Sequence, residues 1–225
     1  MPTPDPTEPE AVPSPPGGWR AHTPNALTIA RLVMTVAVVA CLAGASTSDT
    51  PRLVAAAILF TLAALTDALD GYLARKWHAV SRFGRVMDPL ADKLLVLGTF
   101  AMLAAPGLET LGVQAWMVVV ILARELLVTS LRGVYETLGV DFSATLSGKL
   151  KMIAQSVAAP ALLLLPALTD PQPIGSILAW TVTLITAWSA LPYLLRAWRA
   201  RSVMNDKSNF NNHLRPNNPG PGGDS

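Results

Sequence analysis

The segment DALDGYLAR (67–75), followed by GRVMDPLADK (84–93), places four carboxylates in one short window of the chain. At about 100° per residue on a helix, the first two carboxylates share a face with two very small residues. The other two are spaced i, i+4 on the following helix, in line with a glycine. The carboxylates are Asp67, Asp70, Asp88 and Asp92, and the small residues are Gly71, Ala74 and Gly84. We therefore predict two neighbouring helices that each present a carboxylate pair, with open space beside it.

Long apolar runs flank this segment on both sides. Of the 225 residues, 51% are hydrophobic and 14% are charged, whereas about a quarter are charged in a typical soluble domain. This composition favours a polytopic membrane protein. We predict an all-α fold of six transmembrane helices, near 26–46, 52–77, 86–105, 111–136, 149–168 and 174–198. A catalytic domain is expected at 24–198, between disordered tails at 1–23 and 199–225, which lack apolar runs.

The basic residues are distributed unevenly between the two ends of these helices. Six spans put the loops near 47–52, 106–110 and 169–173 on one side, where Arg52 is the single Lys or Arg of the chain's 17. Basic residues gather on the cytoplasmic side of membrane proteins. We therefore expect an integral protein of the cell (inner or plasma) membrane, with both termini and the acidic segment at the cytoplasmic face.

Carboxylates inside spanning helices are costly, so each one is a candidate for function. Four of them this close repel one another and need cations, and Mg²⁺ or Mn²⁺ suits their oxygen donors. Two ions bridged by shared carboxylates would fit phosphoryl-group chemistry. The alternative is a solvated acidic helix end. Such an end has no need of small residues on its acidic face, or of Arg75 one turn beyond an Asp pair.

The string from Asp67 to Asp92 reads D-x2-D-G-x2-A-R-x8-G-x3-D-x3-D and resembles the signature of the CDP-alcohol phosphatidyltransferases at every fixed position. The resemblance extends over about 24–198. It implies a six-helix membrane enzyme, often a homodimer, with its active site open to the cytoplasmic leaflet. Through it, Asp67, Asp70 and Asp88 correspond to metal ligands, and Asp92 to the general base and a further metal ligand.

The resemblance also implies a site for the donor lipid, CDP-diacylglycerol. The first helix begins with PNALTIAR (24–31), where Asn25 and Thr28 are spaced i, i+3 and could meet one ligand. The expected donor contacts are Asn25, Thr28, Gly71, Ala74, Arg75, Ser81 and Gly84. Asn25 has the alternative of a helix N-cap, and Gly84 that of a helix-packing glycine. Arg31 is expected either to pair with an acidic residue of the site or to snorkel.

Two later segments bear on the acceptor. ARELLVTSLR (123–132) and SGKLKMIAQ (147–155) resemble segments of the family members that use glycerol phosphate, with Met152 in place of a threonine. The expected acceptor phosphate contacts are Arg124, Arg132, Lys149 and Lys151. The alternative role for these cations is anchoring at the cytoplasmic membrane face.

The resemblance implies transfer of a phosphatidyl group from CDP-diacylglycerol to sn-glycerol 3-phosphate. The products would be phosphatidylglycerol phosphate, an intermediate of phospholipid biosynthesis, and CMP. We expect membrane lipid and a second copy of the chain as partners, and no nucleic acid. One alternative is a different acceptor within the family: inositol phosphate, phosphatidylglycerol (giving cardiolipin) or serine. An alternative from another class is a divalent-metal transporter that uses the same aspartates.

Overall fold

The computed structural model describes residues 19–77, 82–137 and 146–198, with side chains described for 26–67, 87–135 and 146–198. The described backbone forms helices and connecting turns and contains no strand, which confirms the all-α prediction. The elements are α1 (Trp19–Leu42), α2 (Thr50–Trp77), α3 (Arg82–Leu103), the 3₁₀ turn η1 (Glu109–Leu111), α4 (Ala115–Thr137), α5 (Leu146–Leu168) and α6 (Ile174–Trp188).

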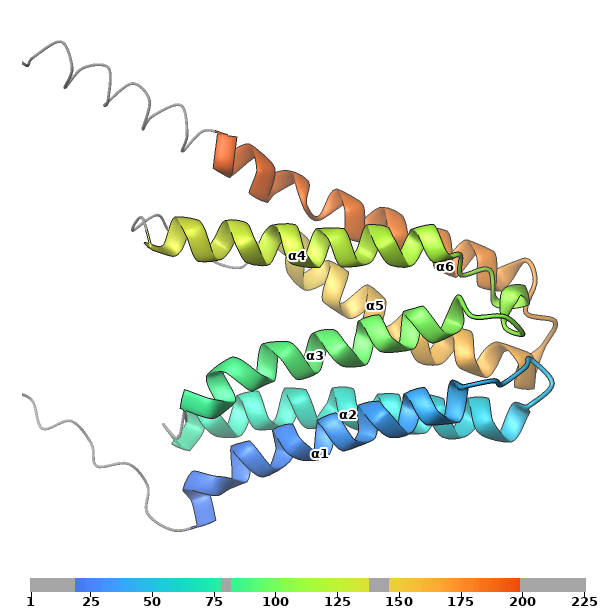
Figure 1. Cartoon of the computed structure of the whole chain (residues 1–225), viewed down its shortest axis with the longest axis horizontal. Helices are drawn as coiled ribbons and strands as arrows, with labels where there is room; N and C mark the ends of the chain where they lie inside the picture. Colours follow the sequence, from blue (N-terminus) through green and yellow to red (C-terminus); the bar gives the residue numbers. More distant parts are fainter. Residues whose placement is uncertain (1–18, 78–81, 138–145, 199–225) are drawn as a thin grey trace, which may run out of the picture.

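The helices run back and forth, so that three connections lie at one end of the molecule (Figure 1). These connections, at 43–49, 104–114 and 169–173, form what we call the loop end. Helix α1 packs on α2 and α3, α2 packs on α5, and α6 packs on both α4 and α5. The helices converge at the loop end and diverge toward the end where Trp19 and Trp198 lie, which we call the open end (Figure 1).

Among the residues that the structure describes, three helical stretches are long and apolar enough to cross a membrane: Thr50–Asp67, Leu146–Leu168 and Ile174–Trp198. A shorter apolar stretch covers Ala26–Leu42. Large apolar side chains are buried between the helices, and others face outward. The outward ones on α1 include Ile29, Val33 and Val36, which follow the helical repeat along one face. Outward apolar surface of this kind is suited to contact with lipid.

The three predicted breaks at the loop end are confirmed, but several helix boundaries differ from the prediction. Helix α1 begins at Trp19 instead of 26, so the region before the first apolar run is already helical. The predicted tails otherwise fall outside the described residues. Helix α4 begins at Ala115 instead of 111, because η1 ends at Leu111 and is followed by Gly112, whose φ of 76° is left-handed and stops the helix.

Close backbone contacts hold the loop end together. A Cβ on Gly112 would lie 2.5 Å from Ser176 Cα, and one on Gly175 would lie 2.6 Å from the Leu111 carbonyl oxygen. The α1–α2 connection is closed by Asp49 Oδ2, which accepts a hydrogen bond from the Ser46 backbone N–H at 2.9 Å. That bond lowers the pKa of the Asp49 carboxyl. Neither Gly112 nor Gly175 leaves room for a Cβ, and Gly112 also has a left-handed backbone conformation.

The last predicted helix, 174–198, is interrupted. Helix α6 ends at Trp188, residues 189–190 form a turn, and helix resumes at 191–198. Pro192 accounts for the break, because it has no N–H to give to the carbonyl four residues earlier and its ring would clash there. The Tyr193 N–H instead bonds to the Ala190 carbonyl oxygen at 3.0 Å. The break directs residues 189–193 toward α4.

Candidate active site

Helix α1 contributes a buried cation to the acidic segment. Arg31 is fully buried, and its Nη1 lies 2.7 Å from Asp67 Oδ1 on α2, whose side chain is one-third exposed. Of the two roles predicted for Arg31, the structure therefore shows pairing and not snorkelling. Burying a guanidinium is costly unless a partner of opposite charge compensates for the lost hydration, and Asp67 is such a partner.

The same helix also reaches the second acidic helix. Thr28, one turn before Arg31, is buried and donates a hydrogen bond from Oγ1 to Asp88 Oδ1 on α3. The negative charge of Asp88 in turn acts on Asp67 through space. Helix α1 thus holds one carboxylate of α2 and one of α3 on the same side of the bundle.

Asp92, one turn beyond Asp88, connects the acidic segment with a basic one. The charges nearest to it include those of Asp67 and Arg31 and those of Lys151 and Glu125. Its side chain also lines a small pocket between α3, α4 and α5. Lys151 and Glu125 line the same pocket. Asp92 therefore lies where the two halves of the predicted site meet.

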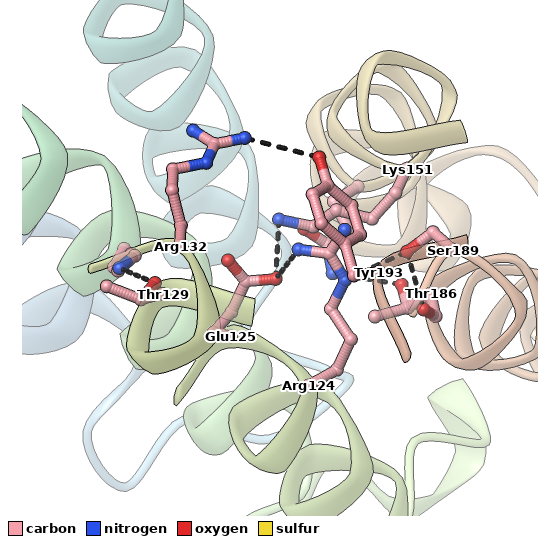
Figure 2. Close-up of polar contacts among 10 residues, drawn as sticks. Arg124, Glu125, Thr129, Arg132, Lys151, Thr186, Ser189 and Tyr193 are labelled. Atoms are coloured by element: carbon pink, nitrogen blue, oxygen red, sulfur yellow. Dashed lines mark hydrogen bonds and ion pairs between the residues drawn. The ribbon is translucent and has the colours of Figure 1, made fainter. Parts of the chain in front are cut away.

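A buried ionic cluster occupies the basic side (Figure 2). Glu125 Oε1 accepts hydrogen bonds from Lys151 Nζ at 2.8 Å and from Arg124 Nη1 at 3.1 Å. None of the three side chains is more than 10% exposed. Two cations share one carboxylate, so the cluster carries a net positive charge next to the pocket. A buried net charge of this kind favours an anionic ligand.

Polar side chains of α5 and α6 support this cluster. Arg124 Nε donates to Ser189 Oγ at 2.8 Å, and Ser189 Oγ donates to the Thr186 carbonyl oxygen at 2.7 Å. Gln155 Nε2 donates to Thr186 Oγ1 at 3.1 Å. These contacts fix the Arg124 side chain, since its guanidinium is held from both ends.

Tyr193 joins Arg124 to Arg132 (Figure 2). Its ring centroid lies 5.9 Å from the Cζ atom of each arginine. Its hydroxyl accepts a hydrogen bond from Arg132 Nη2 at 3.2 Å. The ring is 1% exposed and packs with Val128 and Tyr135. Arg132 thus belongs to the same assembly as Arg124, although its own side chain is more exposed.

The structure groups most, but not all, of the predicted site residues whose side chains it describes. Thr28, Asp67, Asp88 and Asp92 form the acidic side, and Arg124, Arg132 and Lys151 form the basic side. Lys149 is exposed, and among the described residues no hydrogen bond or ion pair joins it to either side. Ser81 lies outside the described residues, as do the side chains of Asn25, Asp70, Gly71, Ala74, Arg75 and Gly84.

The chemistry of the acidic side suits a divalent metal ion. Its donors are carboxylate oxygens, which Mg²⁺ and Mn²⁺ prefer, and they come from two adjacent helices. Among the described side chains, no three acidic, His or Cys groups gather closely enough to form a complete site. Asp70, one turn beyond Asp67 on α2, is the remaining carboxylate of the predicted set.

A family model for the CDP-alcohol phosphatidyltransferases matches residues 21–198, which include both sides of this site. The chain belongs to the CDP-alcohol phosphatidyltransferase family. The match covers all six helices, and it confirms the family resemblance of the 67–92 signature. Members of this family are in general dependent on divalent metal ions. Together with the three long apolar stretches, membership makes this a membrane protein.

Several curated relatives that match the chain share one protein name. CDP-diacylglycerol–glycerol-3-phosphate 3-phosphatidyltransferase of Bacillus subtilis (strain 168) is 41% identical over 153 residues, which cover 67% of this chain and 77% of the relative. The proteins of that name from Escherichia coli (strain K12) and Shigella flexneri serotype 5b (strain 8401) are each 39% identical over 149 residues. These cover 64% of this chain and 78% of each relative.

Three residues of the basic side were not predicted: Thr186, Ser189 and Tyr193. They lie in an apolar run that the prediction treated as a plain spanning helix. Two signals were present in the sequence. Pro192 lies too far inside that run for an uninterrupted helix, and Thr186 and Ser189 are polar residues one turn apart.

Proposed function

We propose that this member of the family transfers the phosphatidyl group of CDP-diacylglycerol to sn-glycerol 3-phosphate, forming phosphatidylglycerol phosphate and CMP. The position of Asp92 carries the proposal. Asp92 lies one turn beyond Asp88 on α3, and its side chain lines one pocket together with Glu125 and Lys151. A base in this place can take a proton from an acceptor whose phosphate is held by the adjacent cations. The names of the relatives support the same donor and acceptor.

In the proposed reaction, Asp92 accepts the proton of the primary hydroxyl of glycerol 3-phosphate. The hydroxyl oxygen forms a bond to the phosphorus that carries the diacylglycerol. The bond from that phosphorus to the bridging oxygen of the pyrophosphate breaks, and CMP leaves with the electron pair. Arg124, Arg132, Lys149 and Lys151 would bind the acceptor phosphate. Of these, Lys151 lines the pocket, and Arg124 is bonded to Glu125, which also lines it.

Asp67, Asp70, Asp88 and Asp92 are the residues that would hold the metal, as two Mg²⁺ or Mn²⁺ ions. When bound, such ions would neutralise pyrophosphate oxygens and stabilise the departing CMP. Arg31 and Thr28 hold Asp67 and Asp88 in place from α1. The proposed donor contacts are those of the signature and of the first helix: Asn25, Thr28, Gly71, Ala74, Arg75, Ser81 and Gly84.

The proposal includes a membrane arrangement. All six helices would cross the cell membrane, with the open end and both terminal segments at the cytoplasmic face. The scarcity of basic residues near the loop end supports this orientation, because Arg52 is the single Lys or Arg of the sequence there. Its Nη2 donates to the Ala43 carbonyl oxygen at 2.7 Å. The enzyme would act as a homodimer. The family match favours this reaction over metal transport.

An acceptor-resolved assay tests the proposal. Membranes containing the full chain are given CDP-diacylglycerol and, in separate reactions, glycerol 3-phosphate, inositol phosphate, phosphatidylglycerol or serine, and CMP release is measured. We expect release with glycerol 3-phosphate, and its loss when EDTA removes divalent ions. Faster release with another acceptor would refute the acceptor assignment and leave the family chemistry in place.

Asp92→Asn tests the role of the base. We expect it to abolish CMP release while the protein still inserts into the membrane. Asp170→Asn is the matched control, because Asp170 is an exposed carboxylate in the α5–α6 connection at the loop end. Unchanged turnover in Asp92→Asn would refute the assignment of Asp92.

A further inference from the structure

We propose that Tyr193 is a positioning residue for the acceptor phosphate, because it holds the guanidinium groups of Arg124 and Arg132 in one site. The inference rests on the proposed function, since it assigns these two arginines to a phosphorylated acceptor. It adds a residue from outside the signature and outside the two basic segments.

The spacing of the two arginines explains why they need such a residue. Arg124 and Arg132 are eight residues apart on α4, which places them on similar sides of the helix and about 12 Å apart along its axis. Two guanidinium groups also repel each other. Without a shared partner, the two side chains would extend away from each other and would not bind the same phosphate.

Tyr193 meets both groups at once. Each guanidinium carbon lies 5.9 Å from the ring centroid, within the range in which an aromatic ring attracts a cation. Arg132 Nη2 also donates to the tyrosine hydroxyl at 3.2 Å. The ring and the hydroxyl therefore make separable contributions: the ring acts on both arginines, and the hydroxyl acts on Arg132.

The helix break after α6 puts Tyr193 in this position. Because residues 189–190 form a turn ahead of Pro192, the following segment brings Tyr193 against α4, where it is 1% exposed. Ser189, in the same turn, bonds to Arg124 Nε at 2.8 Å. The interruption of the helix thus provides Ser189 as a partner for Arg124 and the Tyr193 hydroxyl as a partner for Arg132.

Steady-state kinetics on membranes with the full chain test the role. For Tyr193→Phe, which keeps the ring, we expect KM for glycerol 3-phosphate to rise roughly three- to tenfold, as for loss of one hydrogen bond of ordinary strength, because Arg132 is exposed. For Tyr193→Leu we expect a rise of more than about tenfold, since the cation–ring attraction is also lost. The kcat and the KM for CDP-diacylglycerol should stay within about twofold of wild type, because the reacting groups are untouched.

Tyr135→Phe is the matched control. Tyr135 packs in the same small cluster, and its hydroxyl donates to the Ala197 carbonyl oxygen at 2.9 Å. We expect wild-type kinetics for it. A double variant adds a sharper criterion: in an Arg132→Ala background, Tyr193→Phe should cause no further rise in KM, because the hydroxyl then has no guanidinium to hold.

A binding measurement separates this inference from the proposed function. Inorganic phosphate should raise the Tm of the detergent-purified wild type, and Tyr193→Leu should lose most of that rise. If the wild type releases no CMP with glycerol 3-phosphate, the proposed acceptor is wrong, but the phosphate-dependent Tm still tests Tyr193. The inference is overturned if Tyr193→Leu keeps the phosphate effect or if both variants keep the wild-type KM. It is equally overturned if kcat, both KM values and the Tm without phosphate all change together, as for a simple packing defect.

Discussion

Arg31 Nη1 and Asp67 Oδ1, from α1 and α2, are 2.7 Å apart, and the arginine is fully buried. Replacing the arginine with methionine keeps much of its volume and leaves Asp67 without this partner. We expect Arg31→Met to lower the free energy of unfolding by about 2 kcal/mol, less than for a fully buried pair because Asp67 keeps a third of its exposure. CMP release should fall at least about tenfold, because a proposed metal ligand loses its support.

The double variant Arg31→Met/Asp67→Asn separates the two effects. It removes both charges of the pair, so the Tm should recover toward the wild-type value while CMP release stays at or below that of Arg31→Met. Wild-type turnover in Arg31→Met at the same metal concentration would show that the pair has no part in catalysis.

Glu125 keeps two buried cations together, and its loss should expose their affinity for an anion. Glu125→Gln preserves the shape and removes the charge shared by Arg124 and Lys151. We expect the Tm to fall, by the equivalent of about 2–3 kcal/mol, because two cations lose their counter-ion. Inorganic phosphate should raise the Tm of this variant more than that of the wild type.

Glu109→Gln serves for comparison with Glu125→Gln. Glu109 is an exposed carboxylate at the loop end, and its Oε2 accepts from the Gly107 N–H at 2.9 Å, as an amide oxygen also can. Its Tm should respond to phosphate as the wild type does. An equal response from Glu125→Gln and the wild type would argue against an anion site at the cluster.

Gly112 should tolerate no side chain. Its φ of 76° is strained for other residues, and a Cβ would lie 2.5 Å from Ser176 Cα. We expect Gly112→Ala to destabilise the protein by about 2–4 kcal/mol, from backbone strain and overpacking together. Gly133→Ala is the counterpart within α4, where a Cβ meets open space, and it should stabilise by about 0.5–1 kcal/mol. Thermal unfolding in detergent measures both, and similar Tm values for the two would contradict the close packing at the loop end.

Helical spacing predicts that the carboxylates of the acidic side lie on the faces of two neighbouring helices, and their role as metal ligands stays a prediction. Asp67 and the pair Asp88 and Asp92 repeat at helical intervals among small residues, so their faces follow from the sequence. The partner of Asp67 cannot be predicted from helical spacing. Arg31 had two possible roles in the sequence, and only the packing of α1 against α2 decides between them.

The basic side depends on contacts between residues that lie far apart in the sequence. Arg124 and Lys151 are predicted from segments that resemble those of the family, whereas no role is predicted for Glu125, the carboxylate that joins them. Tyr193 was missed because its partners lie more than 60 residues earlier in the chain, and its position depends on a break inside an apolar run. The start of α4 was placed too early because the local sequence does not show that Gly112 adopts a left-handed conformation.

The contrast between the two ends of the bundle also bears on how a lipid would reach the enzyme. At the loop end, backbones touch with no side chains between them, which makes that end a rigid pivot. At the open end, the helices spread apart (Figure 1), and charged side chains such as Arg31 and Asp67 link neighbouring helices of the bundle. Under the proposed function, the nucleotide headgroup of the donor would enter the site from the cytoplasmic face, and its acyl chains would stay in the bilayer during turnover.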